Sequence, residues 1–264
     1  MEFKQSKPKK TDKLESFWNI LQALVYQEIK TSSDNFTGGL VYKFLKPIIF
    51  TLLISLMIKT FSPNYTLVEG VRFLFLNFLV FFFIQEQITI SSGLGVRRNL
   101  LNLPKVNFFS LLISQSVTSI ANFFPQMIFA LFLYLAISPS FNVLNFLEIF
   151  LFAWALGATY YINASLIMLN NDPLIQVHDF LTRSLIFISA IFYSPEIIPE
   201  EYRGYFMLNP IVHMMEAIRH LNGFPADTYF SINYVVQVII FGLVLFPIIY
   251  FLRIHLLHYG KFKK

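Results

Sequence analysis

The chain has no cysteine and few charged residues, and each shortage excludes a class of protein. Without cysteine, its 264 residues form neither a disulfide framework nor a thiolate metal site. Charged residues make up 13% of the chain and hydrophobic residues 56%, whereas a soluble domain has roughly 25% charged residues. Because so few charges cannot cover a surface that faces water, the composition predicts an integral membrane protein.

Motifs for catalysis and cofactor binding are also missing. The chain has no GxxxxGK[ST] loop for nucleotide phosphates, and its scattered histidines, which include His213 and His220, lack the HExxH spacing of a metal site. His178 and Asp179 are adjacent and could act as an acid–base pair, although packing within a cytoplasmic loop is the preferred interpretation. We therefore expect no catalytic residue, no metal and no cofactor on this chain.

Six apolar runs predict six membrane-spanning helices, each of which needs about 20 mostly apolar residues. They cover residues 40–58, 71–90, 147–168, 181–194 and 234–252, with a longer run inside 108–137 that can bend at Pro125. We find no acidic residue at the centre of a run, which disfavours a carrier driven by protons or sodium ions.

Lysine and arginine are distributed unequally between the predicted loops, and this sets the orientation. One side holds the basic N-terminal segment, Arg97, Arg98, Lys105 and the C-terminal lysines, whereas the other side is mainly acidic. We therefore expect both termini in the cytoplasm, with no cleavable signal peptide before the first span. The same asymmetry explains the formal charge of +5 without a nucleic-acid partner.

Residues 12–30 predict an amphipathic helix that precedes the spans. Apolar residues recur on one face, and Asp12 with Glu15 resembles a capping box. Polar residues interrupt the run too often for it to cross a membrane, so we expect it in the headgroup plane. A helix packed on a soluble partner is the alternative. Residues 1–35 then form a cytoplasmic arm, and residues 36–264 form the transmembrane domain.

Two further segments carry organised polar residues. In the third run, five polar side chains recur every four residues and form a stripe along one helical face: Ser110, Ser114, Thr118, Asn122 and Gln126. This stripe lines a polar path or forms interhelical hydrogen bonds. In the basic inner loop, a short helix over Asn99, Leu100, Leu101, Asn102, Leu103 and Pro104 could dock on a soluble partner, with a plain linker as the alternative.

Four stretches of the sequence, taken together in this order and topology, resemble a known family. They are residues 21–51 (LQALVYQEIK…KPIIFT), 97–109 (RRNLLNLPKVNFF), 171–199 (NDPLIQVHDF…SPEIIP) and 208–224 (LNPIVHMMEAIRHLNGF). The chain resembles the membrane-spanning subunit of ABC-2 type transporters, specifically the permeases of bacterial capsular polysaccharide exporters. It departs from the family pattern at His178, where an arginine is common.

The resemblance implies a set of partners. Two copies of the chain would join two cytoplasmic subunits that hold ATP and Mg²⁺, with residues 99–104 as the coupling helix in a groove of the ATPase. A lipid-linked polysaccharide would cross the bacterial inner membrane, and a periplasmic adaptor and an outer-membrane channel would continue the route. The open alternatives are a permease for O-antigen or teichoic acid and, in a different class, an integral-membrane transferase that acts on lipid-linked sugars.

The resemblance also implies short re-entrant helices on the outer side, between spans five and six. This region includes Asn209 and Pro210. If residues 211–221 are helical, His213, Glu216 and Arg219 share one face. That face either forms an internal Glu216–Arg219 pair, or contacts an anionic glycan or the adaptor. We expect the pair to be exposed, and an exposed pair contributes only about 0.5 kcal/mol.

Overall fold

The computed structural model describes residues 17–27, 36–61, 66–96, 108–137, 142–168, 172–223 and 231–261, and most of these residues are helical. The main helices are α2 (Phe36–Phe61), α3 (Leu67–Val96), α5 (Phe108–Ile137), α6 (Val143–Met168), α7 (Asp172–Ile188), α8 (Glu200–Phe206), α9 (Pro210–Leu221) and α10 (Ile232–Lys261), with a 3₁₀ turn, η1, at Pro195–Ile197. The all-α fold class is therefore confirmed.

Four segments of the described helices are long and apolar enough to cross a membrane: Leu67–Thr89, Phe109–Leu135, Val143–Met168 and Ile232–Arg253. They coincide with the second, third, fourth and sixth predicted spans. The first predicted span lies within α2 and the fifth overlaps α7. A total of six spans stays a prediction.

The bounds predicted for the fifth span are wrong. Helix α7 begins at Asp172 and ends at Ile188, whereas the apolar run suggested a helix from 181 to 194. Pro173 suits the first turn of a helix, since its missing N–H has no intrahelical partner there. The chain turns at Ala190, whose φ of 51° is left-handed, a conformation that often ends helices. The apolar run continues past this turn because Ala190 and Ile191 are buried in the protein.

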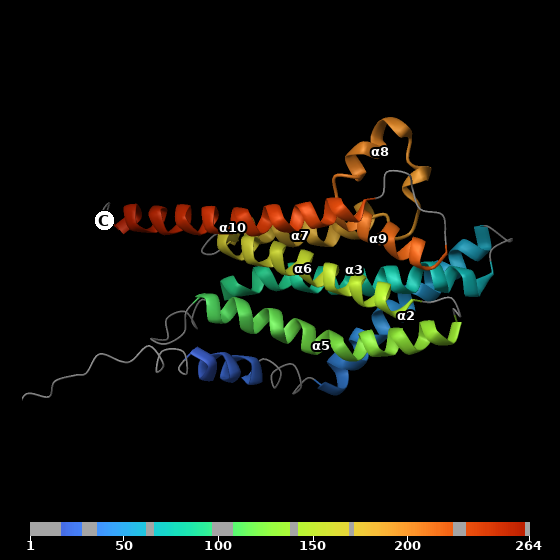
Figure 1. The fold of residues 1–264 in the computed structure, drawn as a ribbon, viewed down its shortest axis with the longest axis horizontal. Coiled ribbons are helices and arrows are strands. Elements are labelled where there is room, and N and C mark those ends of the chain that lie inside the picture. Colours follow the sequence, from blue (N-terminus) through green and yellow to red (C-terminus); the bar gives the residue numbers. More distant parts are fainter. Residues whose placement is uncertain are drawn as a thin grey trace, which may run out of the picture.

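Helix α3 is the centre of the bundle. It contacts α2, α5, α6, α7 and α9, and Leu74, Phe78 and Phe81 along it are fully buried. Figure 1 shows α5, α6 and α10 running lengthwise, with α8 projecting near one end and the C-terminus at the other. Burial of these large apolar side chains stabilises the described part of the bundle.

Residues 17–27 are helical, as predicted, and one face of this helix packs on the bundle. Leu21 and Leu24 are buried, whereas Trp18 and Tyr26 are exposed. Leu24 joins a cluster with Leu111 of α5 and Tyr161 of α6. The rest of the predicted helix, 12–16 and 28–30, lies outside the described residues. Its place in the headgroup plane stays a prediction.

Helix α9 is buried within the bundle, whereas α8 has no buried residue. The Oδ1 of Asn209 accepts a hydrogen bond from the Ile211 N–H at 3.0 Å, which caps the helix, and Pro210 occupies its first turn. At the other end Gly223 has a φ of 79°, which favours glycine after a helix. The predicted helix at 211–221 is therefore confirmed.

Candidate functional site

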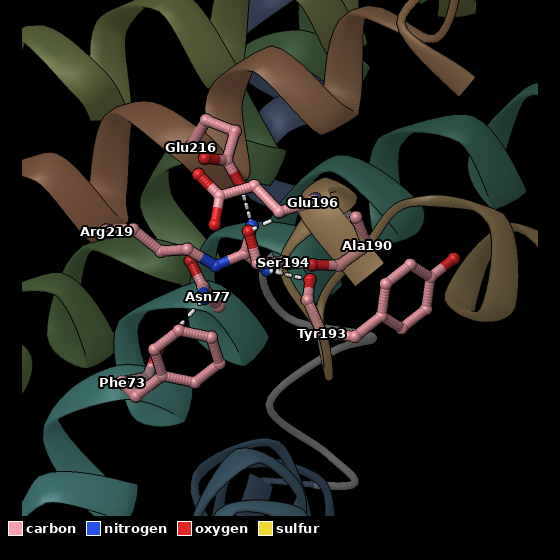
Figure 2. Close-up of polar contacts among 8 residues, drawn as sticks. All are labelled: Phe73, Asn77, Ala190, Tyr193, Ser194, Glu196, Glu216 and Arg219. Carbon is pink, nitrogen blue, oxygen red and sulfur yellow. Dashed lines mark hydrogen bonds and ion pairs between the residues drawn. The ribbon is translucent and has the colours of Figure 1, made fainter. Parts of the chain in front are cut away.

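The organised polar cluster of the described part lies on the buried face of α9 and centres on Arg219 (Figure 2). Arg219 is 1% exposed and Glu216 is fully buried, and the Nη1 of Arg219 pairs with Glu216 Oε1. The Nη2 of Arg219 donates to the backbone oxygens of Ala190 and of Tyr193, the latter at 2.7 Å. The guanidinium also lies 4.9 Å from the ring centroid of Phe73 on α3, at cation–π distance.

These contacts correct the expectation of an exposed pair. The face that carries His213, Glu216 and Arg219 is turned into the protein, so internal pairing is what the geometry shows. Burial lowers the pKa of Arg219 to about 10, an effect that Tyr193 partly opposes. The guanidinium therefore stays charged at neutral pH. Removing one member of a buried pair costs about 3–5 kcal/mol because the other charge remains buried.

Helix α9 holds the end of α7 at two points. Arg219 binds the carbonyl of Ala190, which the left-handed turn directs toward α9. The Nδ2 of Asn209 donates to the Ile188 carbonyl at 3.2 Å and to Ser189 Oγ at 3.3 Å. These donors satisfy carbonyls that a helix C-terminus leaves unpaired. The end of α7 and both ends of α9 thus form one unit, which we call the α9 anchor (residues 188–194 and 209–222).

His213 joins the α9 anchor to α8 and α10. Its Nε2 lies 2.8 Å from the Met207 carbonyl, which can only accept, so Nε2 carries the proton. Its Nδ1 accepts the Ser231 N–H at 3.2 Å. Nδ1 can accept this bond only in the neutral ring, and burial lowers the pKa of His213, an effect that the Met207 contact partly opposes. The ring also lies 4.8 Å from the Tyr234 ring, centroid to centroid.

The last turn of α9 is tied to two other helices by residues that the sequence did not single out. Asn222 donates from Nδ2 to the Arg72 carbonyl of α3 at 3.0 Å and to the Tyr134 hydroxyl of α5 at 3.4 Å. Tyr134 in turn donates to the same Arg72 carbonyl at 2.8 Å. The available signal was the Asn-Gly pair that follows the last apolar residue of α9, which is typical of a helix C-terminus.

The polar stripe of α5 faces the bundle. Ser110, Ser114, Thr118 and Gln126 are buried and Asn122 is half-buried. A cavity of about 10 Å³, the size of about one water molecule, lies beside it. Its lining residues come from α3, α5 and α6: Gln87, Gln115, Ser116, Ser119 and Tyr161. A role in a transport path stays a prediction.

The remaining site predictions have different outcomes. His178 and Asp179 do not lie in a loop, because both belong to helix α7, which starts earlier than the apolar run suggested. The Nδ1 of His178 is 3.5 Å from Asp179 Oδ1, and its ring stacks on Tyr160. The predicted coupling helix, Asn99 to Pro104, lies outside the described residues. Within the described part, no cluster of three or more His, Asp or Glu could hold a metal ion.

Comparisons with known proteins agree with the resemblance drawn from the sequence. No family model matches the chain. The chain is 27% identical over 206 residues to a polysialic acid transport protein, KpsM, of Escherichia coli. The aligned region covers 75% of this chain and 79% of the relative. A second KpsM protein of E. coli is 28% identical over the same extent. The resemblance to capsular polysaccharide transport permeases is confirmed by these two relatives.

Proposed function

We propose that this chain, which resembles the membrane-spanning subunits of capsular polysaccharide transporters, is the permease of an ATP-driven ABC exporter of lipid-linked capsular polysaccharide. The similarity to two polysialic acid transport proteins over 206 residues carries this proposal. Four candidate spans in the described part agree with a multi-pass protein of the bacterial inner membrane. In this proposal six spans cross the membrane and both termini are cytoplasmic.

Energy for transport must come from another subunit, because the chain has no phosphate-binding loop. Two copies of this chain would pair with two ATP-hydrolysing subunits, which hold ATP and Mg²⁺. Residues 99–104 would receive the movement of the ATPase. A periplasmic adaptor and an outer-membrane channel would take the glycan onward.

The α9 anchor has a structural role in this proposal. Glu216 and Arg219 are buried against each other and against backbone carbonyls, so they are not available to a passing glycan. We instead assign to them the fixing of the outer segment. A segment that re-enters the membrane must satisfy its backbone within the protein. Asn209 and Arg219 bind the carbonyls of Ile188 and Tyr193 at the end of α7. At the C-terminus of α9, Arg72 of α3 donates from Nη2 to the Asn222 carbonyl at 3.3 Å.

Complementation in a capsulated strain that lacks its own permease tests the proposal. We expect the chain, expressed with the ATP-binding subunit of a capsular polysaccharide exporter, to restore surface polysaccharide and to co-purify with that ATPase. A hydrolysis-deficient ATPase variant should give the same complex without export. The purified chain alone should not hydrolyse ATP. Loss of capsule export with an intact, ATP-hydrolysing complex would refute the proposal. Export restored only in an O-antigen or teichoic acid strain would favour the alternative substrate.

A further inference from the structure

An apolar cavity of about 290 Å³ lies beneath the N-terminus of α9. Its walls come from α3, α6, α7, α9 and α10 and include Ile88, Leu156, Leu185, Val238 and Leu245. Asn209 and Pro210, at the start of α9, also line it. The volume is at the lower end of the about 300–1,000 Å³ found for small-molecule sites.

The cavity reaches the outer surface of the bundle between α6 and α10. Two of its lining residues, Tyr160 of α6 and Phe241 of α10, are 43% and 66% exposed. Both belong to candidate membrane spans, so in the membrane placement proposed above this opening faces the bilayer. At one wall, Asn163 Nδ2 donates to the carbonyls of Thr159 and Gly242, each at 2.9 Å, and holds α6 against α10.

The residues that line the cavity indicate which kind of molecule fits it. Most of the lining is apolar, so water in the cavity would find few hydrogen-bond partners, and an empty cavity would cost its lining dispersion contacts. The residues that line it include no charged side chain, so it offers no cationic partner for a phosphate headgroup. A flexible hydrocarbon chain from the surrounding bilayer satisfies both conditions. We propose that this cavity holds one acyl chain of a bilayer phospholipid.

An acyl chain in this cavity would pack against the α9 anchor. Asn209 lines the cavity and also holds the end of α7 through the Ile188 carbonyl and Ser189 Oγ. A chain in the cavity therefore packs against the residue that joins α7 to α9. The inference rests on the membrane placement in the proposed function, but not on its substrate or its ATPase.

Photolabelling of the full-length protein tests this site. The protein is reconstituted in vesicles of phosphatidylethanolamine and phosphatidylglycerol that contain a trace of phosphatidylglycerol with a diazirine in the middle of one acyl chain. We expect labelling of α10 to concentrate on its cavity residues, and Val238→Phe, which fills the cavity, to reduce it several-fold. Val244→Phe adds the same side chain at a position of α10 that is 59% exposed and does not line the cavity, and should leave this labelling unchanged.

A second matched pair keeps the test decisive if Val238→Phe fails to fold. Leu245→Phe fills the same cavity, and Leu243→Phe changes an exposed neighbour. Labelling spread evenly around α10, or unchanged in both cavity-filling variants, would overturn the site. So would protection of the cavity by a second copy of the chain. The readout needs neither ATP nor glycan, so its failure leaves the export proposal standing, and failed export leaves the labelling result valid.

Discussion

Arg219 on α9 donates a hydrogen bond to the backbone oxygen of Tyr193 at 2.7 Å, and so joins a buried helix to the turn that follows α7. The same guanidinium pairs with Glu216 and binds the carbonyl of Ala190. One charged side chain thus satisfies three acceptors from two segments. The chain between these segments includes the exposed helix α8, which the anchor holds from both sides.

Arg219→Ala should destabilise the protein rather than only impair export. It leaves Glu216 charged and buried, and we expect a loss of about 3–5 kcal/mol in the free energy of unfolding. Glu216→Leu with Arg219→Met should be less harmful than Arg219→Ala, since no buried charge remains. Thermal unfolding of detergent-purified protein, together with its abundance in membranes, measures both effects.

A control for this prediction is Arg203 of α8, which also donates to two carbonyls, those of Glu196 and Ile198, but at a partly exposed site. Arg203→Ala should change the free energy of unfolding by only about 1 kcal/mol. Normal abundance and melting temperature in Arg219→Ala, with lost export, would instead indicate a direct transport role for Arg219.

Acidification should weaken the α9 anchor through His213. Burial holds the folded-state pKa of His213 below 6.5, so the unfolded chain binds more protons as the pH falls below 6.5. The stabilising contribution is thus complete above pH 6.5 and is lost as pH falls toward the folded-state pKa, at about 1.4 kcal/mol per unit of difference. Melting temperatures between pH 7.5 and 5.5 should fall more steeply for the wild type than for His213→Gln.

His220 is the matched control for this pH dependence, because it lies exposed on the same helix. His220→Gln should keep the pH dependence of the wild type. If His213→Gln and the wild type lose stability in parallel, the neutral tautomer inferred from the Met207 and Ser231 contacts is incorrect.

The sequence predicted where the helices lie better than which of their side chains are buried. Apolar runs located the four candidate spans, because length and hydropathy are local properties. The helical spacing of His213, Glu216 and Arg219 predicted one shared face, which the structure has. The burial of that face was missed, because the spacing of Glu216 and Arg219 is the same for an exposed pair and a buried pair. Its deciding partners are backbone carbonyls of Ala190 and Tyr193, which no residue pattern reveals.

The end of α7 shows a second limit of sequence reasoning. A left-handed residue after a helix is usually glycine, but here it is Ala190. With no glycine there, and with an apolar run that continues to Tyr193, the pattern favoured a helix up to Pro195. The turn is maintained by Arg219 and Asn209 from α9, contacts that depend on the tertiary fold.

Reporter fusions should show six spans with both termini in the cytoplasm. The asymmetry of lysine and arginine motivates this expectation. Alkaline phosphatase and green fluorescent protein fusions after Asn64, Asn102, Ser140, Asp172, Asp227 and Lys264 should alternate, with the first outside and the last inside. A persistent inversion at one of these points would require a different topology.

Leu100→Asp should weaken the link between ATP hydrolysis and export. The flanking charges predict that residues 99–104 are cytoplasmic, and in the proposed coupling helix a carboxylate in place of an apolar contact would be unfavourable. We expect less ATPase in the purified complex, or less export for the same hydrolysis, at normal membrane levels. Gln5→Asp adds the same charge to the N-terminal arm as a control. Full export with an undiminished complex would disprove the coupling assignment.

Gly242→Ala should disrupt the packing of α10 on α6. A Cβ at this position would overlap the Cγ2 of Thr159, and the neighbouring Asn163 amide already binds the Gly242 carbonyl at 2.9 Å. We expect a loss of about 1–3 kcal/mol in the free energy of unfolding, as for other overpacked interiors.

Gly204→Ala on α8, where an added Cβ meets nothing within 4 Å, is the matched control and should be neutral or slightly stabilising. Thr159→Ser removes the clashing methyl group, so the double variant Gly242→Ala with Thr159→Ser should recover most of the lost stability. If the double variant melts no higher than Gly242→Ala alone, the close approach of these two helices at Gly242 is not the cause of the defect.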